Sequence, residues 1–405
     1  MPSAAEALQT TKAAESEPEQ QNKPRMQHLG YLDGLRASAA IFVIFCHMFG
    51  DARLSSPALP KHVSKLLMFL SFGHFAVDLF IVLSGFCLML PVIRNGIELQ
   101  GGALHFFKKR ARRILPPYFA ALTLSIVLIL TLLGHPTGTN WDGALPITQA
   151  GVISHFLLVQ DLFRSTAWKI NYALWSISVE WRIYFLFPIL VVCWRRWGGT
   201  ATAAGALLGS LVLLVAMTLL STSLRKIGFS QLDLSESGAN PQFIGLFSLG
   251  MLGACICFEN QPALKKLKEL PWRFIVLGLL LVVFALAKLK LWHHSAIPIT
   301  WTDYAVGLMS ASAIVLINNT PGSLLHKVFS WRPLVFLGTF SYSIYLIHLP
   351  VLQFYWQYLR PLIPAGPIVK YLVTSTGGVA LIVAVAYLFF LAFERPFLNS
   401  RSSAK

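Results

Sequence analysis

Long apolar stretches recur along this chain, and they constrain its fold more than any other feature. Hydrophobic residues make up 55% of the 405 residues and charged residues only 12%, about half the charge that a soluble protein carries. A transmembrane helix needs about 20 predominantly apolar residues. The sequence therefore predicts an all-α, polytopic integral membrane protein with about ten transmembrane helices, near residues 37–53, 70–91, 114–133, 173–193, 201–221, 243–258, 274–291, 304–318, 334–357 and 370–393.

The two ends of the chain differ from the apolar region between them. The N-terminal segment is rich in Ala, Glu, Gln, Pro and Lys, and it has neither an apolar run nor the core of a signal peptide. We expect residues 1–29 to be a disordered cytosolic tail, 30–398 to be the transmembrane domain and 399–405 to be a second short cytosolic tail.

The net charge of +16 is explained by membrane topology. About two thirds of the 33 Lys and Arg residues, including the cluster Lys108–Arg113, fall on one side of the predicted spans. The positive-inside rule makes that side cytosolic, with both termini inside. The charge therefore gives no reason to expect a nucleic-acid partner. The apolar piece 151–163 is too short to span and is expected to be re-entrant or interfacial.

The five cysteines all fall inside predicted spans, and their spacing does not suit zinc. We expect neither a disulfide framework nor a bound metal.

The first predicted span carries an arginine at its head and a histidine further along. Arg36 and His47 are eleven residues apart, which is almost three helical turns. Both side chains therefore project from one helix face, roughly 16 Å apart along the axis. Ionisable groups at membrane depth are functional candidates because they are costly without a partner or a wet cavity.

The second predicted span contains a histidine and a carboxylate one turn apart. His74 and Asp78 can hydrogen-bond on one helix face, and a carboxylate at this depth needs a functional or structural reason. Ser84 and Gly85 follow, where either a neighbouring helix or an acyl chain can approach closely.

Two later helices carry polar stripes. Glu180 lies with Ser176 and Tyr184 on one face of an otherwise apolar helix, and interfacial anchoring does not explain a glutamate there. His348 shares a face with Tyr345 near the middle of the ninth predicted span. For His348, hydrogen-bonded packing and a functional role are both open.

Three arginines precede the third predicted span. Arg110 and Arg113 share a helix face, whereas Arg112 points elsewhere. Such clusters serve as topology determinants or contacts to anionic lipid. They also suit phosphate, because guanidinium groups bind its oxygens bidentately. Both interpretations stay open from this stretch alone.

Six segments in the order LDGLRASAAIFVIFCH, AVDLFIVLSGF, FFKKRARRILPPY, LWSISVEWRIYFLFP, FSYSIYLIHLPV and FERPF resemble the blocks of the acyltransferase-3 family. The resemblance runs from about residue 31 to 397. It implies a ten-helix membrane enzyme that transfers an acyl group, commonly acetyl, to a hydroxyl. It also implies a catalytic His47 with Arg36, an acyl-CoA site at Arg110, Arg112 and Arg113, and a role for Glu180.

Many members of that family carry a further esterase-like domain at the C-terminus, which is not found before Lys405. The resemblance therefore points to the stand-alone members, including fungal ones that acylate secondary metabolites.

The expected reaction follows from the residue types. Neutral His47 would act as general base on the acceptor hydroxyl, and Asp78 or Glu180 would fix its tautomer or stabilise the imidazolium. Arg36 would polarise the thioester carbonyl or hold a phosphate. Direct transfer and an acyl-histidine intermediate both remain open.

The expected partners are the bilayer, acyl-CoA as donor and a hydroxyl on a small molecule, secondary metabolite or glycan, with no obligate protein partner. A proton-coupled transporter is the alternative, because buried charged residues would serve it too. Against that alternative, the two halves of the chain show no matching pair of interrupted helices.

Overall fold

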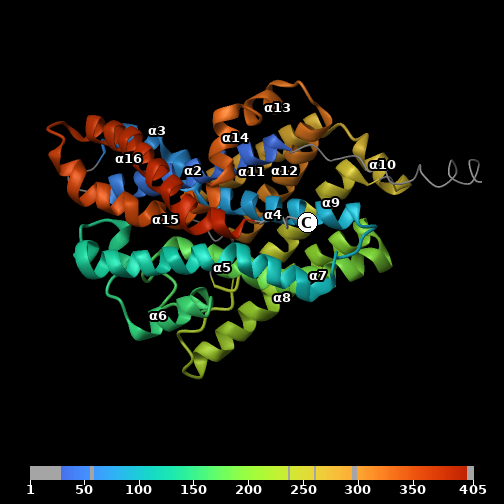
Figure 1. Cartoon of the computed structure of the whole chain (residues 1–405), viewed down its shortest axis with the longest axis horizontal. Helices are drawn as coiled ribbons and strands as arrows, with labels where there is room; N and C mark the ends of the chain where they lie inside the picture. Colours follow the sequence, from blue (N-terminus) through green and yellow to red (C-terminus); the bar gives the residue numbers. More distant parts are fainter. Residues whose placement is uncertain (1–28, 55–58, 236–237, 260, 294–298, 399–405) are drawn as a thin grey trace, which may run out of the picture. The chain divides into compact units, whose positions relative to one another are not determined.

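The computed structural model describes residues 29–54, 59–235, 238–259, 261–293 and 299–398. Those residues are helical apart from connecting loops and one isolated bridge between Phe163 and Leu232 (Figure 1). The predicted tails 1–29 and 399–405 lie outside the described residues, save for residue 29. The α-helices are α2 Gly30–Leu54, α3 Lys61–Leu66, α4 His74–Arg94, α5 Gly102–Leu128, α6 Gln149–Phe156, α7 Trp175–Trp197, α8 Gly199–Lys226, α9 Gln242–Phe258, α10 Pro262–Lys268, α11 Trp272–His293, α12 Ile299–Asn319, α13 Leu324–Phe329, α14 Arg332–Thr339, α15 Ser341–Phe354 and α16 Pro367–Phe389.

Short 3-10 and π-helical segments extend or connect these helices. They are η1 Met68–Phe72, η2 Ile129–Leu133, η3 Asn140–Ala144, η4 Gln160–Leu162, η5 Tyr172–Leu174, η6 Tyr355–Leu359, η7 Arg360–Leu362, η8 Phe390–Glu394 and η9 Arg395–Phe397.

The helices confirm a polytopic membrane protein. Within the described residues, seven helices are long and apolar enough to cross a bilayer, and a bent pair raises that number to eight. The seven are Gly30–Leu54, His74–Arg94, Gly102–Leu133, Tyr172–Trp197, Gly199–Lys226, Trp272–Leu289 and Pro367–Phe397. Two further predicted spans form helices that do not meet this criterion. They are α9, which has 17 residues, and α12, which has 21.

The predicted single span 334–357 is broken. Helices α14 and α15 meet at Phe340 with a bend of 75° between them. Gly338, at the end of α14, lies so close to the backbone of Asp33 in α2 that a Cβ atom would collide with it. Close contact with α2 therefore accompanies the break, and apolar periodicity alone does not reveal such a contact.

Helices α4 and α9 pack backbone to backbone. A Cβ atom on Gly85 of α4 would collide with the Phe247 carbonyl, and one on Gly250 of α9 would collide with the Val82 carbonyl. Small residues allow this approach, since helices in lipid associate through close van der Waals contact. The helix-packing interpretation is therefore confirmed for Gly85.

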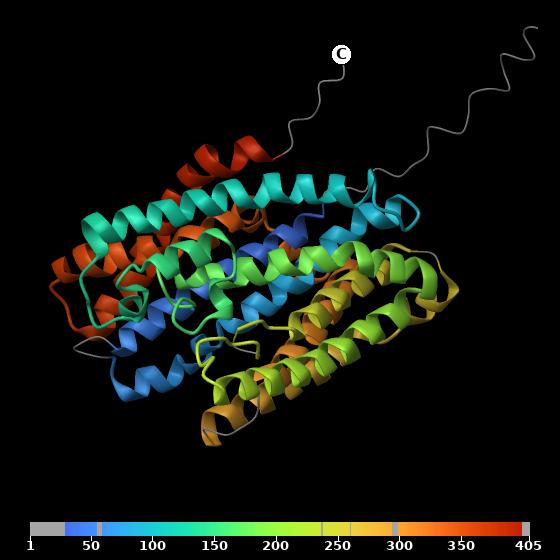
Figure 2. The same ribbon diagram turned by 90° about the horizontal axis from the view of Figure 1, so that it is seen from below.

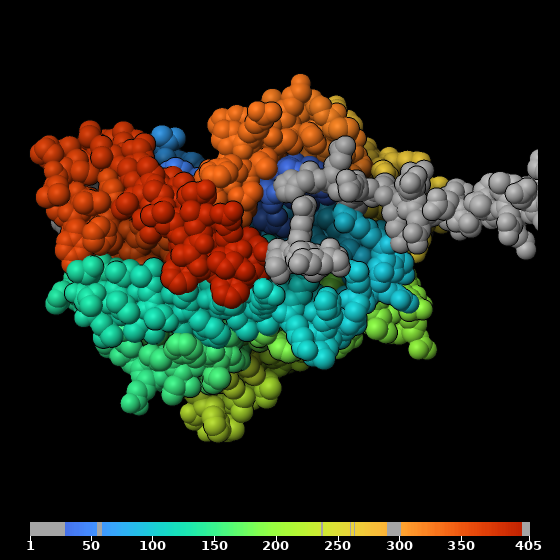
Figure 3. Space-filling model, in the orientation of Figure 1, coloured from blue at the N-terminus to red at the C-terminus, as the bar shows by residue number. Residues whose placement is uncertain are grey.

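The chain between η2 and η5 contains no helix long enough to cross a bilayer. It contains η3, the eight-residue α6 and η4, so the predicted piece 151–163 is indeed too short to span. The Tyr118 hydroxyl donates a hydrogen bond to the His155 carbonyl, and Phe119 stacks on Phe156, which fixes α6 beside α5 (Figure 1). Figure 2 shows the axes of α5 (teal) and α7 (green) nearly parallel, with the chain running in opposite directions along them. Figure 3 shows α5 (teal) against the C-terminal segment (red).

Candidate functional site

Two neighbouring cavities lie between the helices. They share two lining residues, Val77 of α4 and Tyr345 of α15. One has a volume of about 230 Å³ and the other about 400 Å³. We call the smaller one the arginine cavity and the larger one the histidine cavity, after the charged and titratable groups that line them.

The arginine cavity is lined from α2, α4, α5, α7, α14, α15 and η8. Its charged side chains comprise three arginines and three carboxylates, namely Arg36, Arg110, Arg113, Asp33, Glu180 and Glu394. All six sequence segments singled out above thus contribute residues to one cavity. Because their residues lie far apart in the chain, only the packing of the helices brings them together.

Arg36 is held by neighbours at the wall of the arginine cavity. Its guanidinium donates hydrogen bonds to Asp33 Oδ1 at 2.6 Å and to the Cys87 sulfur at 2.9 Å. Asp33 precedes Arg36 by one turn of α2, so the pair forms within the helix. These contacts fix the direction of the guanidinium and leave it facing the cavity.

Arg110 and Arg113 reach the same cavity from α5, and Arg112 does not line it. Arg112 is exposed on another face of the helix, as its spacing predicts. Arg110 lies 6.0 Å from the Phe106 ring centre, and its Nε atom is buried without a hydrogen-bond partner. In the described part of the chain, neither Arg110 nor Arg113 forms an ion pair with a carboxylate. Their charges are therefore available to an anionic ligand.

The polar stripe predicted on α7 faces the arginine cavity. Glu180 accepts a hydrogen bond of 2.5 Å from the Tyr184 hydroxyl, which lies 3.2 Å from the Ser84 hydroxyl. The Ser176 hydroxyl lies 2.7 Å from the Tyr345 hydroxyl. The stripe therefore joins α7 to α4 and α15.

The histidine cavity contains His47. The His47 ring lies 5.5 Å from Tyr172 and 5.2 Å from His348, measured between ring centres. Among the described residues, neither nitrogen of His47 has a hydrogen-bond partner, and the residue is partly exposed. The basic nitrogen of its neutral ring is therefore free to take a proton from a ligand in the cavity.

His348 is fully buried and has one nitrogen fixed by the backbone. Its Nδ1 atom lies 2.7 Å from the Tyr345 carbonyl oxygen, so this nitrogen carries the hydrogen. In the neutral ring Nε2 is then a hydrogen-bond acceptor, and it is buried without a partner. The structure thus brings a second histidine to His47, a meeting that sequence spacing did not indicate.

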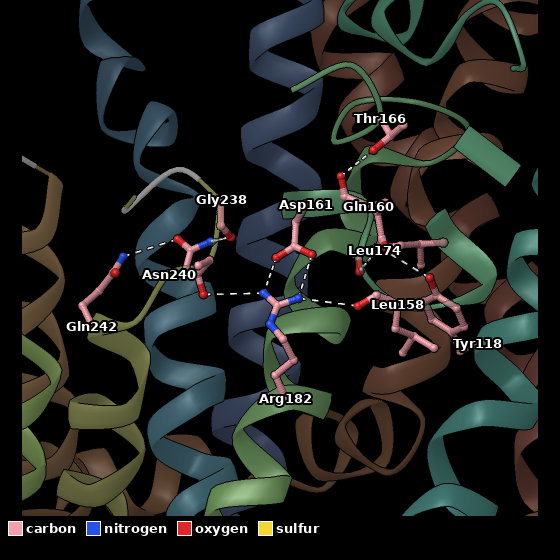
Figure 4. Close-up of polar contacts among 11 residues, drawn as sticks. Tyr118, Leu158, Gln160, Asp161, Thr166, Leu174, Arg182, Gly238, Asn240 and Gln242 are labelled. Atoms are coloured by element: carbon pink, nitrogen blue, oxygen red, sulfur yellow. Dashed lines mark hydrogen bonds and ion pairs between the residues drawn. The ribbon is translucent and has the colours of Figure 1, made fainter. Parts of the chain in front are cut away.

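A partly buried ion pair holds Asp161, which lines the histidine cavity (Figure 4). Arg182 of α7 donates through both terminal nitrogens to the two carboxylate oxygens of Asp161 in η4. Burial raises the pKa of Asp161 above its ordinary value, and the Arg182 charge and hydrogen bonds oppose that shift. The pair ties the loop before α7, with Trp168 and Tyr172, to the membrane helix. Arg182 therefore has a structural partner that its sequence position did not reveal.

Asp78 lies in neither cavity. The structure places it with His74 and Asp303 of α12, and no hydrogen bond joins it to His47. Glu180, in the arginine cavity, also has none to His47. Neither carboxylate is thus in contact with the His47 ring, as the expected tautomer role requires. Asp303 was not identified from the sequence, because only the fold brings it to His74.

Comparison with known proteins identifies the family to which these residues belong. The family model described as an acyltransferase domain matches residues 29–391. The chain belongs to the acyltransferase-3 family. No solved structure matches it.

Several curated bacterial proteins are similar to this family member. The O-acetyltransferase OatA of Staphylococcus aureus is 25% identical over 349 residues, covering 82% of this chain and 52% of OatA. The putative peptidoglycan O-acetyltransferase YrhL of Bacillus subtilis is 28% identical over 364 residues, covering 81% of this chain and 50% of YrhL. Nodulation protein 10 of Rhizobium leguminosarum bv. viciae is 27% identical over 215 residues, covering 47% and 53%. The chain thus spans about half the length of the curated relatives it matches.

Proposed function

We propose that this acyltransferase-3 family member is a membrane O-acyltransferase that moves an acyl group, with acetyl the expected one, from acyl-CoA to a hydroxyl. One observation carries the proposal: a cavity lined by arginines adjoins a cavity lined by His47, with Val77 and Tyr345 between them. The first suits an anionic donor, and the second suits a hydroxyl acceptor and its base.

The arginine cavity is proposed to bind the phosphates of the donor. Arg110 and Arg113 are cations without a carboxylate partner in the described residues, and guanidinium forks match phosphate oxygens. Arg36 is already held by Asp33 and Cys87, which favours a fixed, orienting role such as polarising the thioester carbonyl. Arg112 lies off the cavity, so we no longer include it in the donor site.

The histidine cavity is proposed to be the site of transfer. The acceptor oxygen attacks the thioester carbonyl carbon while His47 takes the hydroxyl proton. A carbon–oxygen bond forms, the carbon–sulfur bond breaks, and the imidazolium returns the proton to the departing thiolate. An imidazole suits this exchange because its ordinary pKa lies near neutrality.

His348 is proposed to position His47 in place of Asp78 or Glu180. Its Nδ1–H is held by the Tyr345 carbonyl, so the acceptor Nε2 remains for a neighbouring imidazole. The two rings are close enough for small side-chain rotation to bring nitrogens together. A hydrogen bond to His47 would select its tautomer and stabilise the imidazolium during transfer.

The acceptor class is proposed from the relatives. The relative OatA is an O-acetyltransferase, and the relative YrhL is a putative peptidoglycan O-acetyltransferase. For this chain we propose a hydroxyl of a glycan or other small molecule that enters the histidine cavity. Trp168 and Tyr172 line this cavity, and aromatic rings of this kind pack well against apolar ring faces.

The proposal is tested with purified full-length protein in detergent or nanodiscs. Acetyl-CoA labelled in the acetyl group is incubated with pools of soluble glycans and polyols, and products are resolved by mass spectrometry. We expect labelled ester and free CoA in equal amounts, both dependent on the protein. The proposal would be contradicted if the protein consumed no acyl-CoA thioester, whatever the acyl chain length of the donor and whatever the acceptor pool.

A further inference from the structure

Three potential metal ligands converge where α4 meets α12. Nε2 of His74 lies 3.2 Å from Asp303 Oδ1 and 3.8 Å from Asp78 Oδ1. One ligand atom from each of the three residues lies within 4.8 Å of the others. Asp78 and Asp303 are both fully buried, with 0% exposure. Two carboxyl groups and one imidazole therefore share a small space inside the protein.

The atoms that face this space lack hydrogen-bond partners. They are both carboxylate oxygens of Asp78, Oδ1 of Asp303 and Nε2 of His74, all of them buried. His74 Nε2 forms a hydrogen bond with neither carboxylate, because 3.8 Å to Asp78 is too long and the 3.2 Å contact with Asp303 lacks the required alignment. Buried ionised carboxylates are destabilising unless positive charge compensates them. A cation between the three residues would supply that charge.

The spacing of the three atoms suits a small divalent transition metal. Bonds of about 2.0–2.2 Å in a tetrahedral site place neighbouring ligand atoms roughly 3.3–3.6 Å apart. The two His–Asp distances, 3.2 and 3.8 Å, lie close to that range, and all three ligand atoms lie within 4.8 Å of one another. One imidazole nitrogen with two carboxylate oxygens is a donor set that zinc accepts, whereas magnesium and calcium prefer oxygen alone.

Neighbouring side chains already hold the ligands in place. The His74 ring stacks on Trp175, with ring centres 5.7 Å apart and an angle of 5° between the planes. Gln242 donates a 3.1 Å hydrogen bond to Oδ2 of Asp303, which leaves Oδ1 toward His74. Partners of this kind orient metal ligands in known sites.

We propose that His74, Asp78 and Asp303 bind a divalent transition-metal ion of the zinc class that joins α4 to α12. His74 also lines the histidine cavity, so the ion would lie at the wall of that cavity. The proposal does not depend on acyl transfer. It replaces the sequence-based expectation that no metal is bound, which considered cysteine spacing and not a ligand from α12.

The test measures metal directly in full-length protein whose purification tag has been removed. The protein is stripped with a chelator, incubated with Zn²⁺, passed through a desalting column and analysed by elemental mass spectrometry. We expect about one zinc per chain, and a melting temperature that Zn²⁺ raises and the chelator lowers. Asp303→Asn and Asp78→Asn should each retain less than a tenth of the wild-type zinc.

Asp233→Asn is the matched control. Asp233 is also buried, but its carboxylate pairs with Arg164 at 3.0 Å and lies in the loop between α8 and α9. This variant should retain zinc at the wild-type level even if it is less stable.

A higher melting temperature in Asp78→Asn than in the wild type would overturn the metal proposal. If the two carboxyl groups instead share a proton, Asp78→Asn removes a repulsion, so the variant would melt higher than the wild type. Zn²⁺ would then leave the melting temperatures of the wild type and of Asp78→Asn unchanged. Zinc retained equally by the wild type, Asp78→Asn and Asp303→Asn would also overturn it. The wild-type measurements need no variant to fold, so they decide the matter if a substitution prevents expression.

Discussion

The imidazole rings of His47 in α2 and His348 in α15 lie 5.2 Å apart between their centres. His348 has its Nδ1 fixed on the Tyr345 carbonyl and its Nε2 without a partner. One histidine is thus oriented by the backbone, and the other opens onto a cavity. This arrangement matches a proton-accepting residue supported by a positioning residue.

Replacement of His348 should lower turnover without changing donor binding. For His348→Ala we expect kcat to fall about 10- to 100-fold, because a misplaced base loses reactive geometry. The KM for acyl-CoA should stay within about twofold, since His348 lies outside the arginine cavity. His348→Gln should recover part of the loss, because its amide oxygen can also accept a hydrogen bond. Wild-type turnover in both variants would make His348 a packing residue.

The donor site is tested by arginines on two faces of one helix. Arg110→Gln and Arg113→Gln should each raise the KM for acyl-CoA, since a lost charged hydrogen bond is worth about 1.5–3 kcal/mol. Arg112→Gln is the control, because Arg112 is exposed and does not line the cavity. Steady-state kinetics over a range of donor concentrations would show the difference. Equal effects in all three variants would return the cluster to a role in topology or lipid contact.

The ion pair in Figure 4 should contribute strongly to stability. Asp161→Asn leaves the partly exposed Arg182 without its bidentate partner, which we expect to cost about 2 kcal/mol, between the values for exposed and fully buried pairs. The half-exposed Arg164 provides a control, because Arg164→Gln should cost less than about 1 kcal/mol. Thermal unfolding in detergent, followed by tryptophan fluorescence, compares the two variants. A smaller loss in Asp161→Asn than in Arg164→Gln would contradict the structural role of the pair.

Membrane orientation stays a prediction from the distribution of positive charge. The continuous helix formed by α5 and η2 has an exposed residue beside each end. They are Gln100 before α5 and His135 after η2, and each is replaced by a single cysteine. The five native cysteines are buried or partly buried, so background labelling should be low. An impermeant thiol reagent should label His135→Cys in intact cells, and Gln100→Cys only after permeabilisation. The reverse pattern would contradict cytosolic termini.

The apolar pattern of the sequence predicted the membrane helices well, because burial in lipid requires long apolar stretches whatever their neighbours. It also placed Arg36 and His47 on one face of α2, and the structure has one of them in each cavity. The break at Phe340 was missed, since it accompanies the contact of Gly338 with α2.

The spacing of residues in the sequence could not predict contacts between helices that are distant in the chain. Asp78 or Glu180 was expected to pair with His47, because a carboxylate orients the histidine in hydrolase triads. The structure instead turns Asp78 toward α12, where Asp303 lies, and brings His348 to His47. Helical periodicity gives the relative direction of side chains on one helix, and a second helix decides which of them meet.

Replacement of His47 tests the proposed function most directly. Acyl transfer and acyl-CoA binding are measured on the same purified His47→Ala protein, beside wild type. Loss of a general base removes about 10²–10⁴ in rate, so we expect transfer to fall at least 100-fold while acyl-CoA affinity stays within about twofold. Transfer above about a tenth of the wild-type rate would contradict the role of His47 as general base. Absence of thioester consumption by the wild type, together with dissipation of a substrate gradient in proteoliposomes, would instead establish the transporter alternative.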